Sequence, residues 1–181
     1  QMGHALADVL FGKVNPSGKL PFTFPAKLVD NGAHALNAYD PADLSVEYKE
    51  GIYVGYRWAE KQNIKPLFAF GHGLSYTDFT YGDAECAKAS VKAGSNVTVS
   101  VDVTNSGKVA GKEVVQLYIG DDESSVDRPV KELKGFRKIS LEPGETKTVT
   151  FTIEPDMLKY FDAAKHEWVL ENGKFTAYVG S

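Results

Sequence analysis

Carboxylates are the first groups in this sequence that could do chemistry, because paired acids can divide general acid and general base work or share a hard cation. One tight acidic cluster stands out, at Asp121, Asp122 and Glu123. Adjacent acids at a hairpin tip are typical of a solvated loop, and no spaced calcium-loop pattern surrounds these three. We therefore interpret the cluster as a solvated loop, with neither a catalytic pair nor a metal site.

The other reactive residue types are dispersed along the chain. The four histidines follow no metal-ligand spacing and are His4, His34, His72 and His166. Three serines lie near glycines, but none sits in the Gly-x-Ser-x-Gly turn of a hydrolase nucleophile: Ser17, Ser75 and Ser106. Cys86 is the single cysteine, so it forms no intrachain disulfide, and we expect a small, buried or half-buried hydrophobe. His72 stands between two glycines, where we expect it to hydrogen-bond a tight corner.

Three aromatic residues offer flat rings that can stack on the apolar faces of sugars: Tyr53, Tyr56 and Trp58. Packing against a neighbouring layer explains them more simply, and we favour that interpretation. A glycosylation sequon at Asn96, Val97 and Thr98 falls at the start of a predicted strand, so we attribute it to chance.

Length and composition describe a globular protein. The chain has 181 residues, 43% of them apolar, which suffices for one domain, or for one domain plus a piece of another. The net charge of −4 comes without a basic run, which argues against nucleic acid as a partner. No stretch approaches the ~20 apolar residues that span a bilayer, so we expect no membrane partner. The chain starts at Gln1 without a signal-peptide pattern, and we expect this to be a point within a longer protein.

The elements that must position these residues fall into two groups. In the first, residues 4–11 predict a short helix that ends at Gly12, residues 19–25 an edge strand, and residues 51–58 another strand. A helix and isolated strands cannot bury a core by themselves. We therefore predict that residues 1–75 are a remnant of a larger domain.

From residue 76 onward, short alternating strands recur between turn residues, a pattern typical of an all-β sandwich. We predict about seven strands, drawn from residues 79–83, 97–103, 112–119, 131–141, 149–153, 159–162, 168–170 and 174–179. The apolar members of these runs predict a core that includes Val99, Val101, Val115, Leu117, Phe136, Phe151 and Val179.

Seven segments carry a family resemblance. They are residues 5–12 (ALADVLFG), 15–21 (NPSGKLP), 48–57 (YKEGIYVGYR), 70–77 (FGHGLSYT), 128–136 (RPVKELKGF), 141–145 (LEPGE) and 178–180 (YVG). In this order they resemble the C-terminal half of family 3 glycoside hydrolases, which are exo-acting β-glucosidases and β-xylosidases. The first two are similar to the end of that family's second domain, an α/β sandwich. The next two resemble the joining segment, and the last three a fibronectin type III-like domain.

The resemblance implies a parent enzyme that hydrolyses terminal β-D-glucosyl residues with retention of configuration. In this family the nucleophilic aspartate lies on an N-terminal (β/α)8 barrel, and the acid/base glutamate lies in the second domain, upstream of its final helix. Neither region matches this chain. We therefore expect no catalytic, cofactor-binding or metal-binding residue here. The implied partners are the upstream catalytic domains of the same enzyme and its oligosaccharide or glucoside substrate, in a periplasmic or secreted parent.

The expected fold is mainly β: residues 1–75 are the remnant of the α/β sandwich domain with a linker, and residues 76–181 are the fibronectin type III-like, immunoglobulin-like sandwich. The expected function is that of a non-catalytic segment that braces the catalytic domains. The alternative is a carbohydrate-binding or interaction module, which would show exposed aromatic residues along one sheet face. Residues 120–129 form a long polar loop that we expect to lean toward the catalytic domains and to shape outer subsites.

Overall fold

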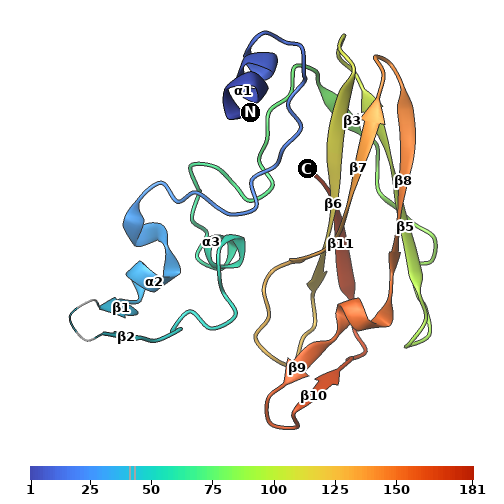
Figure 1. Ribbon diagram of the computed structural model, residues 1–181. Coiled ribbons are helices and arrows are strands. Elements are labelled where there is room, and N and C mark those ends of the chain that lie inside the picture. The colour runs from blue at the N-terminus through green and yellow to red at the C-terminus, as the bar shows by residue number, and fades with distance from the viewer. Residues whose placement is uncertain (41, 43) are drawn as a thin grey trace.

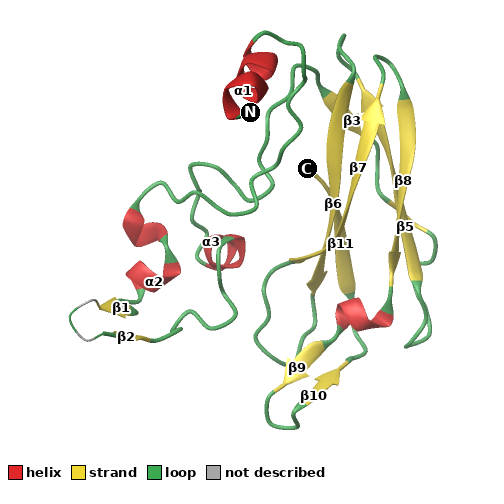
Figure 2. Ribbon diagram, in the orientation of Figure 1, coloured by secondary structure: helices red, strands yellow, loops and turns green. Residues whose placement is uncertain are grey.

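The computed structural model describes residues 1–40, 42 and 44–181. We call residues 1–75 the front segment; it lies to one side of a β-sandwich (Figures 1 and 2). Its elements are α1 (Met2–Leu10), the 3₁₀ helix η1 (Leu28–Asp30), α2 (Gly32–Ala35), β1 (Tyr39–Asp40), β2 (Ser45–Val46) and α3 (Tyr56–Lys61). None of the helices described is long and apolar enough to cross a membrane.

The helix predicted at the start of the chain is confirmed as α1. The Phe11 amide donates to the Ala7 carbonyl, and the chain then leaves the helix at Gly12, whose φ of 71° lies in the left-handed region. Glycine adopts this conformation without the steric cost that a Cβ atom would bring, which explains why the helix stops here.

Two strands predicted in the front segment are wrong. Residues 51–58 form a turn followed by α3, because Gly51 and Gly55 take φ values of 58° and 65° that interrupt an extended chain. Residues 19–25 run alongside the chain near Phe68 but form only one isolated bridge, between Phe24 and Phe68. Their two prolines lack the amide hydrogens that a longer ladder would use.

Two antiparallel sheets form the sandwich, which confirms the predicted fold class (Figure 2). The strands of the first sheet, in spatial order, are β11 (Phe175–Gly180), β6 (Gly111–Asp121) and β7 (Glu132–Leu141). The second sheet is built on β5 (Val97–Asn105), which pairs with β8 (Thr146–Ile153), β3 (Phe79–Tyr81) and β4 (Glu85–Cys86). A 3₁₀ helix, η2 (Pro155–Leu158), leads from β8 into a small hairpin of β9 (Tyr160–Asp162) and β10 (Glu167–Val169).

The core lies between the two sheets. Its buried members come from β5, β6, β7 and β8 and are Val99, Val101, Val103, Val115, Leu117, Ile119, Leu141, Val149, Phe151 and Ile153. Five of the seven predicted core residues are among them, and Val179 is partly buried against the cluster. The prediction for Phe136 is wrong, because this side chain is 67% exposed. Phe136 pairs with Gln116 on the sheet face that points away from the core, whereas its neighbour Gly135 packs on Phe151.

Candidate functional site

The front segment is held against the outer face of the sheet β11-β6-β7, and we call this contact the joint. Tyr56 of α3 stands at its centre. Its hydroxyl accepts a hydrogen bond of 2.9 Å from the backbone amide of Leu133 in β7. The Tyr56 ring stacks on Phe70 with 5.0 Å between ring centroids, and it meets Tyr118 of β6 edge to face at 5.8 Å. Such ring pairs add to the burial energy of the contact, so the joint has a packed aromatic centre.

The other two aromatic residues singled out in the sequence are also used for packing, as expected. Tyr53 and Trp58 are 8% and 9% exposed. Trp58 covers Gly32 of α2, where an added Cβ atom would come within 3.1 Å of the indole ring. Tyr53 donates a hydrogen bond of 3.2 Å from its hydroxyl to the Arg128 carbonyl. None of the three rings is a free platform for a sugar.

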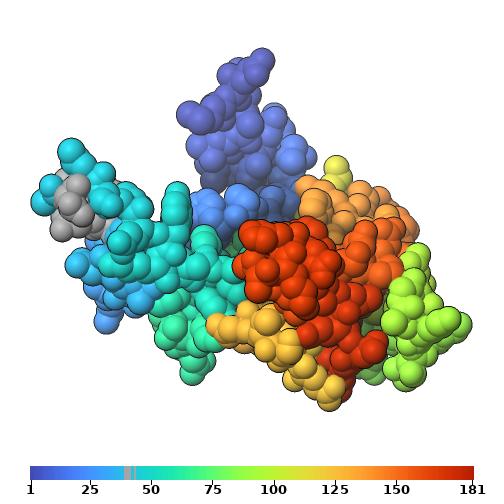
Figure 3. Space-filling view, turned by 90° about the horizontal axis from the view of Figure 1, so that it is seen from below, coloured from blue at the N-terminus to red at the C-terminus, as the bar shows by residue number. Residues whose placement is uncertain are grey.

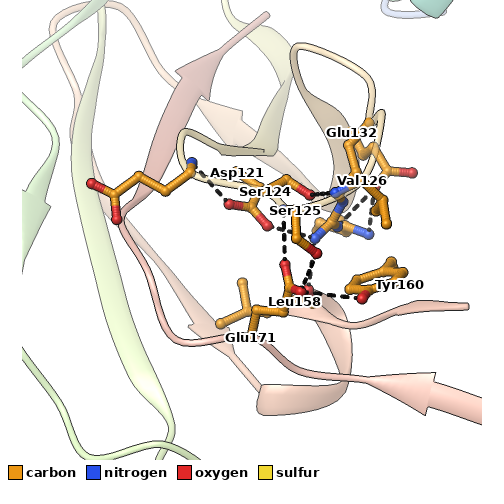
Figure 4. A network of polar contacts seen from close by, with 11 residues as sticks. Asp121, Ser124, Ser125, Val126, Glu132, Leu158, Tyr160 and Glu171 are labelled. Carbon is orange, nitrogen blue, oxygen red and sulfur yellow. Dashed lines mark hydrogen bonds and ion pairs between the residues drawn. The ribbon is translucent and has the colours of Figure 1, made fainter. Parts of the chain in front are cut away.

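Arg128 organises a polar network beside the joint (Figure 4). Its Nη1 atom lies 2.9 Å from Asp121 Oδ2 and donates to the Leu158 carbonyl at 3.1 Å. The Asp121 side chain is 3% exposed and that of Arg128 is 10% exposed. The solvated-loop interpretation therefore fails for Asp121, although Asp122 and Glu123 are exposed. The reason is that the chain turns back after β6, so that Arg128, seven residues after Asp121, covers the Asp121 carboxylate.

Glu132 connects this network to the front segment. Its carboxylate lies 3.2 Å from Arg57 of α3, 3.2 Å from Lys134 and 3.4 Å from Arg128. Burial alone would raise the pKa of Glu132, but the charges and hydrogen bonds of Lys134, Arg57 and Arg128 outweigh it and lower that pKa below its ordinary value. The carboxylate is therefore held in its ionised form.

The loop of residues 120–129 leans on the front segment, as Figure 3 shows from below (gold against cyan). Lys61 of α3 contacts Asp127 in this loop at 2.7 Å and donates to the Tyr53 hydroxyl at 3.1 Å. Burial raises the pKa of Tyr53, and the hydrogen bond from Lys61 lowers the pKa of Asp127. On its other side the loop is bound to the chain that follows the hairpin, because the Ser125 amide donates to Glu171 at 3.1 Å (Figure 4).

A groove of about 470 Å³ lies between this loop, the hairpin β9-β10 and α3, and we call it the hairpin groove. Its lining includes Arg57, Pro129, Lys134, Tyr160, Phe161 and Trp168. Phe161 and Trp168 are 50% and 64% exposed, and their rings meet edge to face at 5.7 Å. Sequence reasoning missed this pair, although two aromatic residues flanking a polar turn were a visible signal.

The remaining candidates lie apart from the joint. His72 is exposed at a corner, where its backbone carbonyl accepts from the Leu20 amide at 2.9 Å and its ring lies 5.2 Å from that of Phe68. Cys86 is exposed, which overturns the expectation of burial, since β4 is a short edge strand. Ser75 donates to Asn15 at 3.0 Å. Among the residues described, no three histidine, cysteine or acidic side chains gather in a metal-binding group.

Comparison with known proteins places both parts of the chain. Residues 1–76 match the model of the glycosyl hydrolase family 3 C-terminal domain, and residues 113–181 match the model of the fibronectin type III-like domain. The chain is 52% identical over 181 residues to beta-glucosidase BoGH3A of Bacteroides ovatus. It is 54% identical over 179 residues to thermostable beta-glucosidase B of Acetivibrio thermocellus. Each alignment covers 99% of this chain, but only 24% and 23% of the relative.

Solved structures give the same result. The chain superposes on the beta-glucosidase DesR of Streptomyces venezuelae, solved with D-glucose, with a TM-score of 0.88 at 43% identity, over 98% of this chain and 23% of that one. For the Bifidobacterium adolescentis GH3 beta-glucosidase the TM-score is 0.90 at 38% identity, and the match covers 98% of this chain and 26% of that one. The chain thus spans about a quarter of the length of the relatives it matches. It belongs to the family 3 glycoside hydrolases, and it corresponds to the C-terminal part of their beta-glucosidases, where the end of the family's C-terminal domain is followed by a fibronectin type III-like domain.

Proposed function

We propose that this chain is a non-catalytic brace in a β-glucosidase, divided at residues 75 and 76 into the end of the α/β sandwich domain and the fibronectin type III-like domain. The observation that carries the proposal is the joint, above all the ion pair of 3.2 Å between Arg57 and Glu132. Because packed rings and partly buried charges both cross the joint, the sandwich holds the end of the preceding domain at a fixed angle. A brace needs such a rigid connection.

The rest of the same enzyme is the partner that this proposal requires. The front segment leaves many large apolar side chains in solvent, among them Met2, Leu10, Phe11, Leu28, Val29, Tyr48, Leu67 and Leu74. Large apolar side chains left in solvent in such numbers are consistent with a face that another part of the protein covers. In the relatives, about three quarters of the polypeptide lies outside the matched region, and we assign this face to it.

Three carboxylates with little exposed surface are engaged in structural contacts, which supports a non-catalytic role. Asp121 and Glu132 are paired with Arg128, and Glu113 lies 3.4 Å from Lys19 and accepts from the Tyr81 hydroxyl at 2.9 Å. A retaining glycosidase needs two carboxyl groups about 5 Å apart on either side of the scissile bond, one of them free to protonate the leaving group. In this proposal the parent hydrolyses terminal β-D-glucosyl residues with groups that lie outside these 181 residues.

An activity assay tests the proposal directly. The purified chain, with its β structure confirmed by circular dichroism, is incubated with an aryl β-D-glucoside and an aryl β-D-xyloside, and we expect no turnover of either. Turnover that copurifies with the chain and disappears in the variants Asp121→Asn or Glu50→Gln would refute the non-catalytic role. In the intact parent, the pair Arg57→Met and Glu132→Gln should lower the melting temperature while the KM for the aryl glucoside stays unchanged.

A second candidate function, a carbohydrate-binding module, is favoured by the exposed pair Phe161 and Trp168. Flat exposed rings beside a groove are suited to the apolar faces of pyranose rings. The two rings lie on the hairpin β9-β10. The pattern expected of a carbohydrate-binding module was different, a line of exposed aromatic residues along one face of a sandwich sheet. Titration with cello-oligosaccharides should then give binding that Trp168→Ala abolishes and Phe136→Ala, a control at another exposed ring, leaves intact. Absence of binding to the unmodified chain removes this candidate.

A further inference from the structure

The two long sides of the sandwich differ. On one side β7 leads through a turn into β8, and Arg137 of β7 crosses between the sheets to donate from its Nε atom to the Thr150 carbonyl of β8 at 3.1 Å. On the other side stand β11 and the two-residue strand β4. Among the described residues, no strand lies beyond β11 in its sheet. We call this second side, formed by residues 175–180 and 85–86, the open edge.

The backbone of β11 directs hydrogen-bonding groups outward at the open edge. The Asp122 amide donates to the Lys174 carbonyl at 2.9 Å, so Lys174 and every second residue after it bond to β6. The residues between them, Phe175, Ala177 and Val179, therefore point their amides and carbonyls away from β6. In the part of the chain that the structure describes, no other segment bonds to these three backbones. Such a row of groups is a template for one more strand.

A hollow of about 250 Å³ leads into the core at the same edge. Its walls include Val99, Ile119 and Ile153 of the core, together with Phe175 and Ala177 of β11. The core-facing side chains of β11 are only partly buried, whereas Ile119, opposite Ala177 on β6, is 5% exposed. The core is therefore incompletely covered where β11 and β4 diverge.

Cys86 lies at the mouth of this hollow. It is opposite Val99 in the pairing of β4 with β5, and opposite residues of antiparallel strands point to the same face of a sheet. The Cys86 side chain is therefore on the core face, yet it is exposed and lines the hollow. Cysteine is among the residue types most often buried in proteins, so its exposure on a core face indicates a surface that another element covers.

The strand order indicates which element fits. In sandwiches of the immunoglobulin type, the strands of one sheet lie in the order C′-C-F-G. By pairing and by order along the chain, β7, β6 and β11 correspond to C′, C and F, while β5 and β8 correspond to B and E of the other sheet. The G strand, which lies next to F, has no counterpart among the described residues. Its place is the open edge.

We propose that the open edge is the docking site for one further β-strand of the parent polypeptide, from outside residues 1–181. The strand runs antiparallel to β11, bonds to the outward backbone groups of Phe175, Ala177 and Val179, and places apolar side chains at alternate positions over the hollow. In the relatives, about three quarters of the polypeptide lies outside the matched region, so a parent of their size has chain to supply it.

A strand of the same polypeptide fits this site better than a second copy of the chain, because the strand beyond F belongs to the same domain in sandwiches of this type. The inference rests on the chain being part of a longer enzyme. It is independent of the brace and of the carbohydrate-binding candidate, since it concerns neither the joint nor the hairpin groove and its test measures no activity.

The single cysteine of the chain serves as the probe. The 181-residue chain and the intact parent are treated with iodoacetamide under native conditions, and mass spectrometry follows alkylation of the peptide that contains Cys86. We expect alkylation to be about tenfold slower in the parent, because the strand must first open. The control is a second thiol at an exposed position on the opposite side, introduced as Thr150→Cys in β8, which should react at similar rates in both proteins. Equal rates at Cys86, or equal protection of both thiols in the parent, would overturn the proposal.

Hydrogen exchange resolved to single residues shows what covers Cys86. In the 181-residue chain, the outward amides of Phe175, Ala177 and Val179 should exchange quickly, whereas those of Thr176 and Tyr178, which bond to β6, should exchange slowly. In the parent all five amides should exchange slowly. If Cys86 is protected in the parent while the three outward amides still exchange quickly, a surface other than a strand covers the edge, and the proposal is wrong.

A proline substitution tests the backbone contact. Ala177→Pro removes one outward amide hydrogen and keeps the bonds to β6, as an edge strand tolerates, and the matched control Ala177→Ser keeps that amide. In the parent, we expect alkylation of Cys86 to become about tenfold faster in Ala177→Pro and to stay nearly unchanged in Ala177→Ser. An equal change in both variants would contradict pairing with β11. Light scattering gives the oligomeric state, and a dimer of the 181-residue chain with a protected Cys86 would assign the open edge to a second copy instead.

Discussion

Arg57 in α3 and Glu132 in β7 are joined by an ion pair whose Nη2 and Oε1 atoms lie 3.2 Å apart. The two residues are far apart in the sequence, and the contact closes one side of the joint. Glu132 also lies close to Lys134 and Arg128, so a single carboxylate contacts three cations, of which Arg128 is shared with Asp121. Removing it should leave these cations facing one another across a partly buried surface.

The variant Glu132→Gln should lower the free energy of unfolding by about 1–2 kcal/mol, because the three cations lose their common counter-charge. Folding lowers the pKa of Glu132 below its ordinary value of 4.5. The ionised carboxylate therefore stabilises the fold fully above pH 4.5, and this stabilisation is lost as the pH falls through the lower pKa of the folded protein. Urea unfolding at several pH values measures both effects. The difference between wild type and variant should shrink below about pH 4, and a constant difference would contradict the assignment.

Asn105 should be among the most sensitive polar residues of the sandwich. It is fully buried, donates to the carbonyls of Val109 and Leu141 at 2.8 and 3.1 Å, and accepts from the Thr77 hydroxyl at 2.6 Å. Asn105→Ala leaves these three groups without their partner, and we expect a loss of about 3 kcal/mol. Denaturant unfolding measures it. The control Asn96→Ala, at an exposed position, should change stability by less than about 0.5 kcal/mol. Similar losses in both variants would refute the importance of the buried Asn105 hydrogen bonds.

Gly120 should not tolerate even one added methyl group. A Cβ atom at this position in β6 would lie 2.4 Å from the Val130 carbonyl oxygen, a backbone atom that cannot rotate away. We expect Gly120→Ala to cost about 2–3 kcal/mol and to displace the loop of residues 120–129. The matched control is Gly180→Ala in β11, where nothing lies within 4 Å of the added atom. Thermal unfolding of the two variants should separate them clearly, and equal melting temperatures would show that the loop can adjust without cost.

We predict that the loop of residues 120–129 shapes outer subsites in the intact enzyme. Its contacts with Lys61 and Glu171 hold it between the front segment and the hairpin region. Removing residues 123–126 from the parent should weaken binding of long oligosaccharides more than binding of a simple aryl glucoside. Steady-state KM values for both substrates measure this. The variant Lys61→Met, which loses the contacts with Asp127 and Tyr53 but keeps the full length of the loop, serves as the control. Equal changes for both substrates on removal of residues 123–126 would count against the role.

Local patterns in the sequence were sufficient for most strands of the sandwich, although β4 was missed and the strands predicted at 159–162 and 168–170 form the separate hairpin β9-β10. The valines of β5 alternate with polar residues, so their burial follows from the two-residue period of a strand. The end of α1 could likewise be predicted, because Gly12 supplies the left-handed conformation that stops a helix. β7 is the instructive exception. Its apolar residues Leu133, Phe136 and Ile139 are spaced by three, so no single face could be chosen, and Phe136 was assigned to the wrong one.

The joint was decided only by the tertiary structure. The sequence named Tyr53, Tyr56 and Trp58 as packing residues, but nothing local indicated that the Tyr56 hydroxyl meets the amide of Leu133, 77 positions later. In the sequence Asp121 is part of an acidic run, and only the folded chain shows that Arg128 covers its carboxylate. In the same way, only the folded chain shows that Gly71 lies against the side-chain amide of Gln116. The physical reason is the same in each case. Alternation and turn chemistry act between neighbours in the chain, whereas burial of a charge or an amide depends on which distant segment lies against it.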